Sequence, residues 1–118
     1  MARSKYGAKR TTVDGITFAS MKEARRYQEL KLLEKAGEIH GLRLQPRFPL
    51  CADRGVPPEP PVILGYYIAD FEYCECRRGQ KCERTRRVVE DVKGFKTPLY
   101  RWKKKHMAAE HGIQIREI

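Results

Sequence analysis

Two strand-like stretches of this sequence carry acidic residues where a buried strand would place apolar ones. The first is Tyr67-Ile68-Ala69-Asp70-Phe71, and the second is Val88-Val89-Glu90-Asp91-Val92-Lys93-Gly94. An ionised carboxylate inside an apolar strand costs free energy unless a partner compensates its charge. We therefore expect a sheet that carries a small charged cluster at one end.

The first third of the chain predicts a hairpin followed by a helix. Asp14-Gly15 lies between two β-favouring triplets, which is the pattern of a tight hairpin. Ser20 with Glu23 three residues later matches a capping box and predicts a helix from about residue 20 to residue 36. Apolar residues at helical spacing predict its buried face: Ala24, Tyr27, Leu30 and Leu33.

Three strands are expected in the middle of the chain. Residues 42–50 alternate apolar and polar, but two prolines indicate an edge strand or a broken one. Residues 53–61 contain four prolines and one glycine and predict a loop. Residues 62–76 and 84–93 predict two strands that pair as an antiparallel hairpin around a turn at residues 77–80.

A second helix and a last strand complete the pattern. Thr97 and Pro98 are a favourable N-cap and first helical residue, and Gly112 follows the end of the helix. We expect residues 113–118 to form a strand parallel to the preceding one. One face of this helix is expected to be buried, and it consists of Leu99, Trp102, His106 and Ala109. We expect Trp102 and His106 on this face to pack in the core.

The predicted order is α-β-β-β-α-β with a small hairpin in front. This order predicts an α/β or α+β fold with a mixed central sheet flanked by helices. A single domain would span residues 11–118 and follow a basic flexible arm at residues 1–10, for which a solvated tail without a role is an equal alternative.

The net charge of the chain indicates which class of partner it is expected to bind. The 118 residues include 25 Lys and Arg against 15 Asp and Glu, a net charge of +10. Such an excess favours a polyanion, most often nucleic acid. No run of about 18 apolar residues exists to span a membrane, and no secretory signal is visible, so a soluble cytoplasmic protein is expected.

The charged cluster has the composition of a magnesium site. Strand periodicity places Asp91 and Lys93 on one face, and the predicted hairpin can bring Asp70 beside them. Carboxylates, a backbone carbonyl and water are the ligands that Mg²⁺ prefers. Glu23 lies in the apolar stripe of the first helix and can face the sheet, although it also completes the capping box. A purely structural ion pair within the hairpin is the alternative for Asp70, Asp91 and Lys93.

The pattern Glu23, Asp70 and Asp91-Val92-Lys93 on this order of elements resembles the PD-(D/E)xK nuclease superfamily, which has a restriction-endonuclease-like core. Four short sequence motifs are similar to those of a narrower family of small phage-encoded proteins related to Holliday-junction resolvases. These motifs are Thr12 to Phe18, Lys22 to Tyr27, Leu44-Gln45-Pro46 and Val89 to Gly94. The resemblance thins at residues 51–61 and 74–84. One departure is Ala69, where the superfamily pattern has proline before the first acid.

This resemblance implies a metal-dependent DNA endonuclease. Asp70 and Asp91 would be the motif acids, and Lys93 the motif lysine. With the Val92 carbonyl and Glu23, the two acids would bind Mg²⁺ or Mn²⁺ against the scissile phosphate. The resemblance also implies a homodimer that acts on DNA, with branched DNA as a candidate substrate, in recombination of a phage or prophage within a bacterial host.

A basic segment follows the cluster and predicts phosphate contact, because cations near a helix N-terminus bind phosphate. A solvated helix face is the alternative. No base-reading motif is visible, so recognition of DNA shape is expected. The basic residues are Lys96, Arg101, Lys103, Lys104 and Lys105.

Four cysteines leave three interpretations open. A structural zinc site, a disulfide and free thiols are all compatible with their spacing, which lacks the usual short knuckle of zinc sites. The four are Cys51, Cys74, Cys76 and Cys82.

Two other functions compete with the nuclease. The chain could be a non-catalytic nucleic-acid-binding module, or an interaction protein or subunit that acts only within a larger complex.

Overall fold

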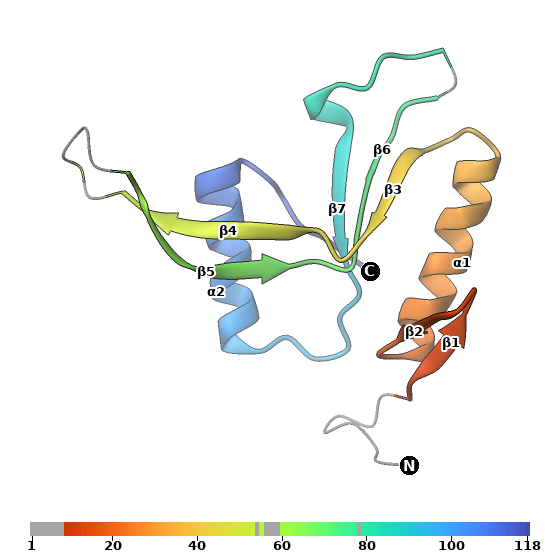
Figure 1. The fold of residues 1–118 in the computed structure, drawn as a ribbon, viewed down its shortest axis with the longest axis horizontal. Helices are drawn as coiled ribbons and strands as arrows, with labels where there is room; N and C mark the ends of the chain where they lie inside the picture. Colours follow the sequence, from red (N-terminus) through yellow and green to blue (C-terminus); the bar gives the residue numbers. More distant parts are fainter. Residues whose placement is uncertain (1–8, 54, 56–59, 78) are drawn as a thin grey trace. The chain divides into compact units, whose positions relative to one another are not determined.

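The computed structural model describes residues 9–118 except residues 54, 56–59 and 78. The chain has an α+β fold with a mixed sheet, as predicted (Figure 1). It divides into two compact units: unit 1 contains residues 1–42 and 73–87, and unit 2 contains residues 43–72 and 88–118. The predicted arm lies outside the described residues, apart from residues 9 and 10.

Unit 1 begins with the predicted hairpin. Strands β1 (Thr11–Val13) and β2 (Ile16–Phe18) pair antiparallel. Asp14 and Gly15 have φ values of 51° and 75°, the left-handed conformation that a tight two-residue turn needs at both central positions.

Helix α1 (Met21–Lys35) follows, and it lies beside the hairpin in Figure 1. The Ser20 hydroxyl oxygen accepts the Glu23 N–H at 3.1 Å, so the predicted N-cap is confirmed. Ala24, Tyr27 and Leu30 are buried, but Leu33 is 38% exposed, so the predicted apolar face was one residue too long.

A four-stranded sheet has the order β3-β6-β7-β8. Its strands are β3 (His40–Leu44), β6 (Phe71–Cys74), β7 (Arg87–Asp91) and β8 (Arg116–Glu117). Strand β8 runs parallel to β7, which confirms the predicted crossover. The final strand is shorter than the predicted 113–118, and a 3₁₀ helix at Arg84–Arg86 replaces the start of the predicted strand at 84–93.

The other two-stranded sheet arises because two predicted strands are each broken. Strands β4 (Arg47–Ala52) and β5 (Val62–Ile68) pair with each other, and not with the four-stranded sheet. The break expected at the prolines is confirmed at Gln45-Pro46, whereas the single strand predicted for residues 62–76 was wrong, because Ala69-Asp70 interrupt it. Two backbone hydrogen bonds join these two breaks. Gln45 N–H donates to the Asp70 carbonyl at 2.9 Å, and Ala69 N–H donates to the Pro46 carbonyl at 3.1 Å.

Helix α2 (Pro98–His106) is capped by Thr97, whose hydroxyl accepts the Tyr100 N–H at 3.0 Å. It continues as a π-helical turn at Met107–His111 and ends at Gly112, whose φ is 65°. In Figure 1 it crosses the β4–β5 sheet, to which it is joined by the bond from Lys103 Nζ to the Tyr66 carbonyl at 2.8 Å.

The buried face of α2 differs from the prediction. Tyr100 and Met107 are buried, while Leu99 and Trp102 are 59% and 72% exposed, so the core role expected for Trp102 was wrong. The apolar core of unit 2 consists of Phe48, Leu50, Tyr67, Ala69, Val89, Tyr100, Met107 and Ile115. Within the described part of the chain, no helix is long and apolar enough to cross a membrane.

Candidate functional site

Asp70 lies in unit 2 at the break between β5 and β6. Its backbone N–H donates to the Glu90 carbonyl at 3.1 Å, which fixes it beside the end of β7. Its carboxylate Oδ2 accepts the Val92 N–H at 2.7 Å. The break in the strand therefore turns the Asp70 side chain toward the Asp91-Val92-Lys93 segment.

Asp91 is the last residue of β7 and is 1% exposed. Its Oδ2 accepts a hydrogen bond from the Tyr67 hydroxyl, and its Oδ1 lies 3.3 Å from Lys93 Nζ. These two partners compensate the buried charge, as a carboxylate at such a position requires. Burial, then the hydrogen bond to Asp91, raise the pKa of Tyr67, so its hydroxyl stays a donor at neutral pH.

Lys93 extends the cluster toward solvent. Its side chain is 28% exposed, and its ammonium lies 4.5 Å from the centroid of the Tyr100 ring. A cation over an aromatic face is attracted by the ring quadrupole. The ammonium therefore sits between Asp91 and Tyr100 and still reaches water.

Glu117 in β8 forms a second charged cluster in unit 2. Its carboxylate accepts from Lys104 Nζ at 2.7 Å and from the Tyr100 hydroxyl at 3.1 Å, and it lies 3.3 Å from Lys96 Nζ. The hydrogen bond from Lys104 is the largest of the causes that lower the pKa of Glu117 to about 2. Burial is the largest cause that raises the pKa of Tyr100, and its hydrogen bond to Glu117 is the next largest. Tyr100 thus touches both clusters.

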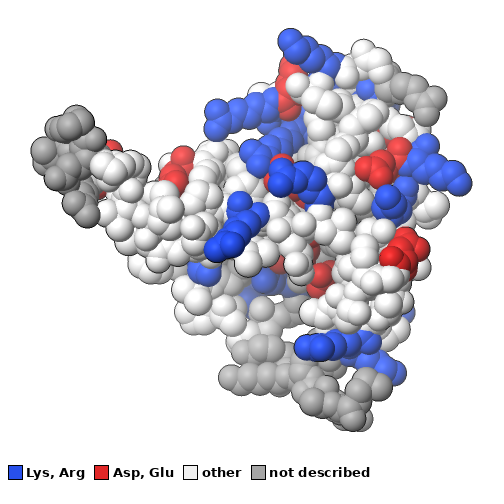
Figure 2. Space-filling view, viewed as in Figure 1, with Lys and Arg blue, Asp and Glu red and all other residues white. Residues whose placement is uncertain are grey.

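The predicted basic segment surrounds a hollow in unit 2. Four of its five members line this hollow together with Tyr100 and Glu117: Lys96, Arg101, Lys104 and Lys105. The fifth, Lys103, bonds to the Tyr66 carbonyl. Figure 2 shows Lys and Arg side chains spread over the visible face, with smaller groups of acidic side chains between them.

Glu23 belongs to unit 1, where it is 9% exposed and follows the N-cap of α1. The predicted residues that the structure brings together within unit 2 are therefore Asp70, Asp91, Val92 and Lys93. The metal-binding role of Glu23 stays a prediction.

Three of the four cysteines gather in unit 1. The sulfur atoms of Cys74, Cys76 and Cys82 lie within 4.8 Å of one another, an arrangement that can bind a metal such as zinc. Hydrogen bonding with the other two thiols raises the pKa of Cys76 to about 12 and lowers the pKa of Cys82. Cys51 belongs to unit 2, where its backbone N–H donates to Glu110 Oε1 at 2.5 Å, and its part in a four-cysteine site stays a prediction.

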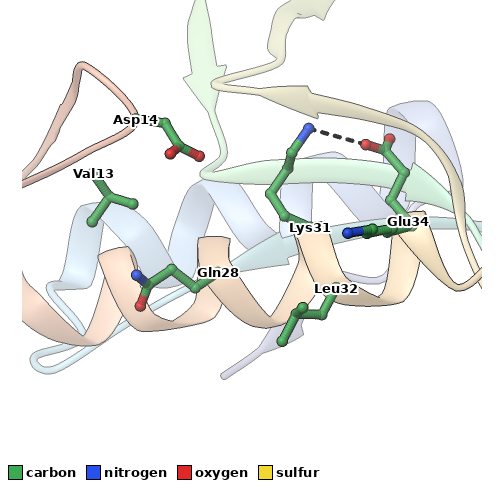
Figure 3. A pocket seen from close by; sticks show the side chains of 7 residues that line it. Val13, Asp14, Gln28, Lys31, Leu32 and Glu34 are labelled. Carbon is green, nitrogen blue, oxygen red and sulfur yellow. Dashed lines mark hydrogen bonds and ion pairs between the residues drawn. The ribbon is translucent and has the colours of Figure 1, made fainter.

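Another hollow lies beside α1 in unit 1, and Figure 3 shows its lining. Lys31 Nζ donates to Glu34 Oε1 at 3.2 Å within it. Asp14, on the rim, accepts a hydrogen bond from the Tyr27 hydroxyl at 3.0 Å. None of the predicted catalytic residues lines this hollow: it is formed by Val13, Asp14, Gln28, Lys31, Leu32, Glu34 and Lys35.

Sequence reasoning missed Tyr67, Tyr100 and Glu117. The two tyrosines have the pattern of ordinary core aromatics, and no local signal separates them from Phe48. Glu117 had one available signal. It follows Ile113 and Ile115 at the period of a strand, so a carboxylate occupied the third position of an apolar face.

The fold and the site together define an α+β protein. Its two carboxylates, Asp70 and Asp91, and Lys93 lie together beside the break between β5 and β6. Residues 3–116 match the model of the family described as "Protein of unknown function (DUF1064)", and the chain belongs to that family. No curated protein and no solved structure matches the chain.

Proposed function

We propose that this protein is a Mg²⁺-dependent DNA endonuclease that hydrolyses phosphodiester bonds. One observation carries the proposal: Asp70 Oδ2 accepts the Val92 N–H at 2.7 Å while Lys93 pairs with Asp91 at 3.3 Å. Two acids and a lysine, separate in the sequence, are thereby held in one cluster. The resemblance to PD-(D/E)xK nucleases assigns these residues to the same roles.

The donor set fits magnesium. Asp70 and Asp91 offer carboxylate oxygens, and Val92 adds a backbone carbonyl, which are the hard ligands that Mg²⁺ and Mn²⁺ prefer. When bound, the ion would stabilise negative charge on the phosphate and lower the pKa of a coordinated water. The resemblance adds Glu23 as a ligand, either directly or through water.

The chain's own residues would act around that ion. Tyr67 holds the Asp91 carboxylate in one orientation through its hydroxyl. The ammonium of Lys93, partly open to water, would orient the attacking water or neutralise charge that develops on the phosphate.

The DNA backbone would contact the basic hollow beside the cluster. Arg101 and Lys105 are exposed there and are the best placed to meet phosphate, whereas Lys96 and Lys104 also pair with Glu117. Phosphate contacts position a duplex without reading its sequence. We therefore propose a structure-selective enzyme similar to Holliday-junction resolvases, acting as a homodimer on branched DNA of a phage or prophage in the bacterial cytoplasm.

Cleavage of a labelled DNA panel tests the proposal. Linear duplex, single strand, flap and four-way junction would each be incubated with Mg²⁺, Mn²⁺ or EDTA. We expect metal-dependent cutting by the wild type and by the control Asp53→Asn, an exposed carboxylate of the same unit. Asp91→Asn and Lys93→Ala should abolish cutting while DNA binding persists. Full Mg²⁺-dependent cutting by either variant would contradict the assigned roles.

A second candidate function is a non-catalytic DNA-binding module. It is favoured by the two partners that Asp91 already has, Tyr67 and Lys93, because a buried ion pair can be structural alone. Intact, salt-sensitive binding without cutting of any substrate by the wild type would support it. Weak binding that does not respond to salt would instead indicate an interaction protein or a subunit of a larger complex.

A further inference from the structure

We infer that unit 1 contains a structural zinc site formed by Cys74, Cys76, Cys82 and His40. The three sulfur atoms lie within 4.8 Å of one another, and the Cys76 and Cys82 sulfurs are 2.9 Å apart. A disulfide requires about 2.05 Å, so the two thiols are not bonded. Ligand sulfurs about 2.3 Å from one tetrahedral zinc ion would lie about 3.8 Å apart, which is within the span of this group.

Local structure explains why the three thiols meet. Cys74 ends β6, and Cys76 follows two residues later. The chain then reverses through a turn in which Gln80 N–H donates to the Arg77 carbonyl at 2.9 Å, and the Gln80 side chain accepts the Arg77 N–H at 2.9 Å. Cys82 therefore returns to the other two sulfurs.

His40 is the candidate for the fourth ligand. It is the first residue of β3, and its Nδ1 lies 3.5 Å from the Cys76 sulfur, the separation of about 3.5 Å that nitrogen and sulfur ligands of one zinc ion show. The same nitrogen lies 2.5 Å from the Cys76 carbonyl oxygen. His40 lies outside the 4.8 Å group, so its imidazole must turn from this carbonyl to complete the tetrahedron.

The local charge suits such a site. Three thiolates and a neutral imidazole around Zn²⁺ leave a net charge of −1. Cations near cysteine favour the thiolate, which is the form that binds metal. The segment that carries Cys82 is rich in them: Arg77, Lys81, Arg84 and Arg86.

The ion would join three parts of unit 1. It would link the start of β3 at His40, the end of β6 at Cys74, and the segment before the 3₁₀ helix at Cys82. That segment is exposed and contributes little to an apolar core. Metal binding would thus supply stability that side-chain burial does not, as in other small metal-stabilised folds.

The test measures metal content and thermal unfolding of the whole chain, neither of which depends on cleavage. We expect one zinc per wild-type chain by elemental analysis, and a lower unfolding temperature after chelation. Co²⁺ should give a thiolate charge-transfer band and the visible absorption of a tetrahedral site. Cys51→Ser is the matched control, because it removes the cysteine outside the group, and it should behave as the wild type.

The variants separate the ligands. Cys74→Ser, Cys76→Ser and Cys82→Ser should each lose the zinc, and His40→Ala should weaken zinc affinity by about tenfold or more. A wild type that carries no zinc and takes up none would overturn the site, as would a Cys76–Cys82 disulfide found by mass spectrometry. Unchanged affinity and an unchanged Co²⁺ spectrum in His40→Ala would remove His40 from the site. Because a variant can also fail by misfolding, the wild-type metal content alone suffices to refute the proposal.

Discussion

Tyr67 positions Asp91 through a single hydroxyl, so removing that hydroxyl tests the cluster with little change of shape. We expect Tyr67→Phe to weaken apparent Mg²⁺ affinity in the cleavage assay by about 10–100-fold, the usual cost of losing a contact behind a metal ligand. A loss of about 1–3 kcal/mol in the free energy of unfolding should accompany it, because a buried charged acceptor loses its donor. Cleavage rate against Mg²⁺ concentration and urea unfolding measure the two effects.

Tyr66→Phe is the matched control for that variant. Tyr66 precedes Tyr67 in β5, is 38% exposed, and holds Lys103 through its backbone carbonyl, which the substitution keeps. Equal Mg²⁺ dependence in the two variants would show that the Tyr67 hydroxyl does not support the metal ligand.

Glu117 makes stability depend on pH at the acid end. Its pKa is about 2 in the folded protein against an ordinary 4.5, so its contacts contribute fully above about pH 4.5 and are lost as pH falls through about 2. The stability difference between wild type and Glu117→Gln should therefore be constant above pH 4.5 and shrink toward pH 2. Urea unfolding at a series of pH values measures it.

Two lysine variants serve as the comparison for Glu117. Lys104→Met removes the hydrogen bond that is the largest cause of the lowered pKa and should flatten the pH dependence. Lys105→Met changes a neighbour in the same hollow and should preserve it. The opposite ranking would mean that Lys104 is not the partner that matters.

Among single residues, those that act through local rules could be predicted from the sequence. Ser20 and Thr97 cap their helices as expected, and Lys93 pairs with Asp91 as the expected alternation indicated, although β7 ends at Asp91. Tyr67 could not be predicted as a partner of Asp91, because the two residues are 24 positions apart in the sequence. Their contact depends on where β5 ends and the chain continues into β6.

At the scale of elements, the break at Gln45 stores backbone strain. Its φ of 51° is a left-handed value that costs a residue with a side chain about 1–2 kcal/mol and costs glycine little. We expect Gln45→Gly to be more stable than Gln45→Ala by about 1 kcal/mol in urea unfolding. At Arg43, inside β3, the order should reverse, since glycine weakens an extended strand. A more stable alanine at position 45 would contradict the strained turn.

Helix α2 shows why its buried face escaped sequence reasoning. Tyr100 and Met107 are seven positions apart and share a face, but the positions between them on that face hold Lys103 and Lys104. The aliphatic parts of these two lysine side chains belong to the apolar face, while their ammonium groups extend to the Tyr66 carbonyl and to Glu117. A count of apolar residues therefore selected Leu99 and Trp102, which are exposed.

The sheet was only half predictable for a related reason. Hydrophobic alternation marks a strand but carries no information about which sheet it joins, so residues 62–76 read as one strand. The change of sheet at Ala69-Asp70 depends on bonds with Gln45 and Pro46, far away in the sequence. The mixed class and the parallel last strand followed from the order of elements alone.

For the whole molecule, a net charge of +10 predicts DNA binding that weakens steeply with salt. We expect Arg101→Ala and Lys105→Ala each to reduce the slope of log K against log salt by about 1, the contribution of one phosphate contact. Lys103→Ala should change the slope less, because its ammonium is held by the Tyr66 carbonyl at 2.8 Å. Fluorescence anisotropy over a salt series measures the slopes, and identical slopes in all three variants would exclude the basic hollow as the contact surface.

The chain passes between its two units at residues 42–43, 72–73 and 87–88, so each unit is assembled from two separate segments. Neither unit can be expressed as one uninterrupted fragment. During synthesis on the ribosome, unit 1 lacks its second segment until residue 87 has emerged, and unit 2 lacks part of its core until Ile115 has followed. A nascent chain halted at residue 72 would therefore hold no finished unit, and one halted at residue 87 would hold both segments of unit 1 but only the first segment of unit 2.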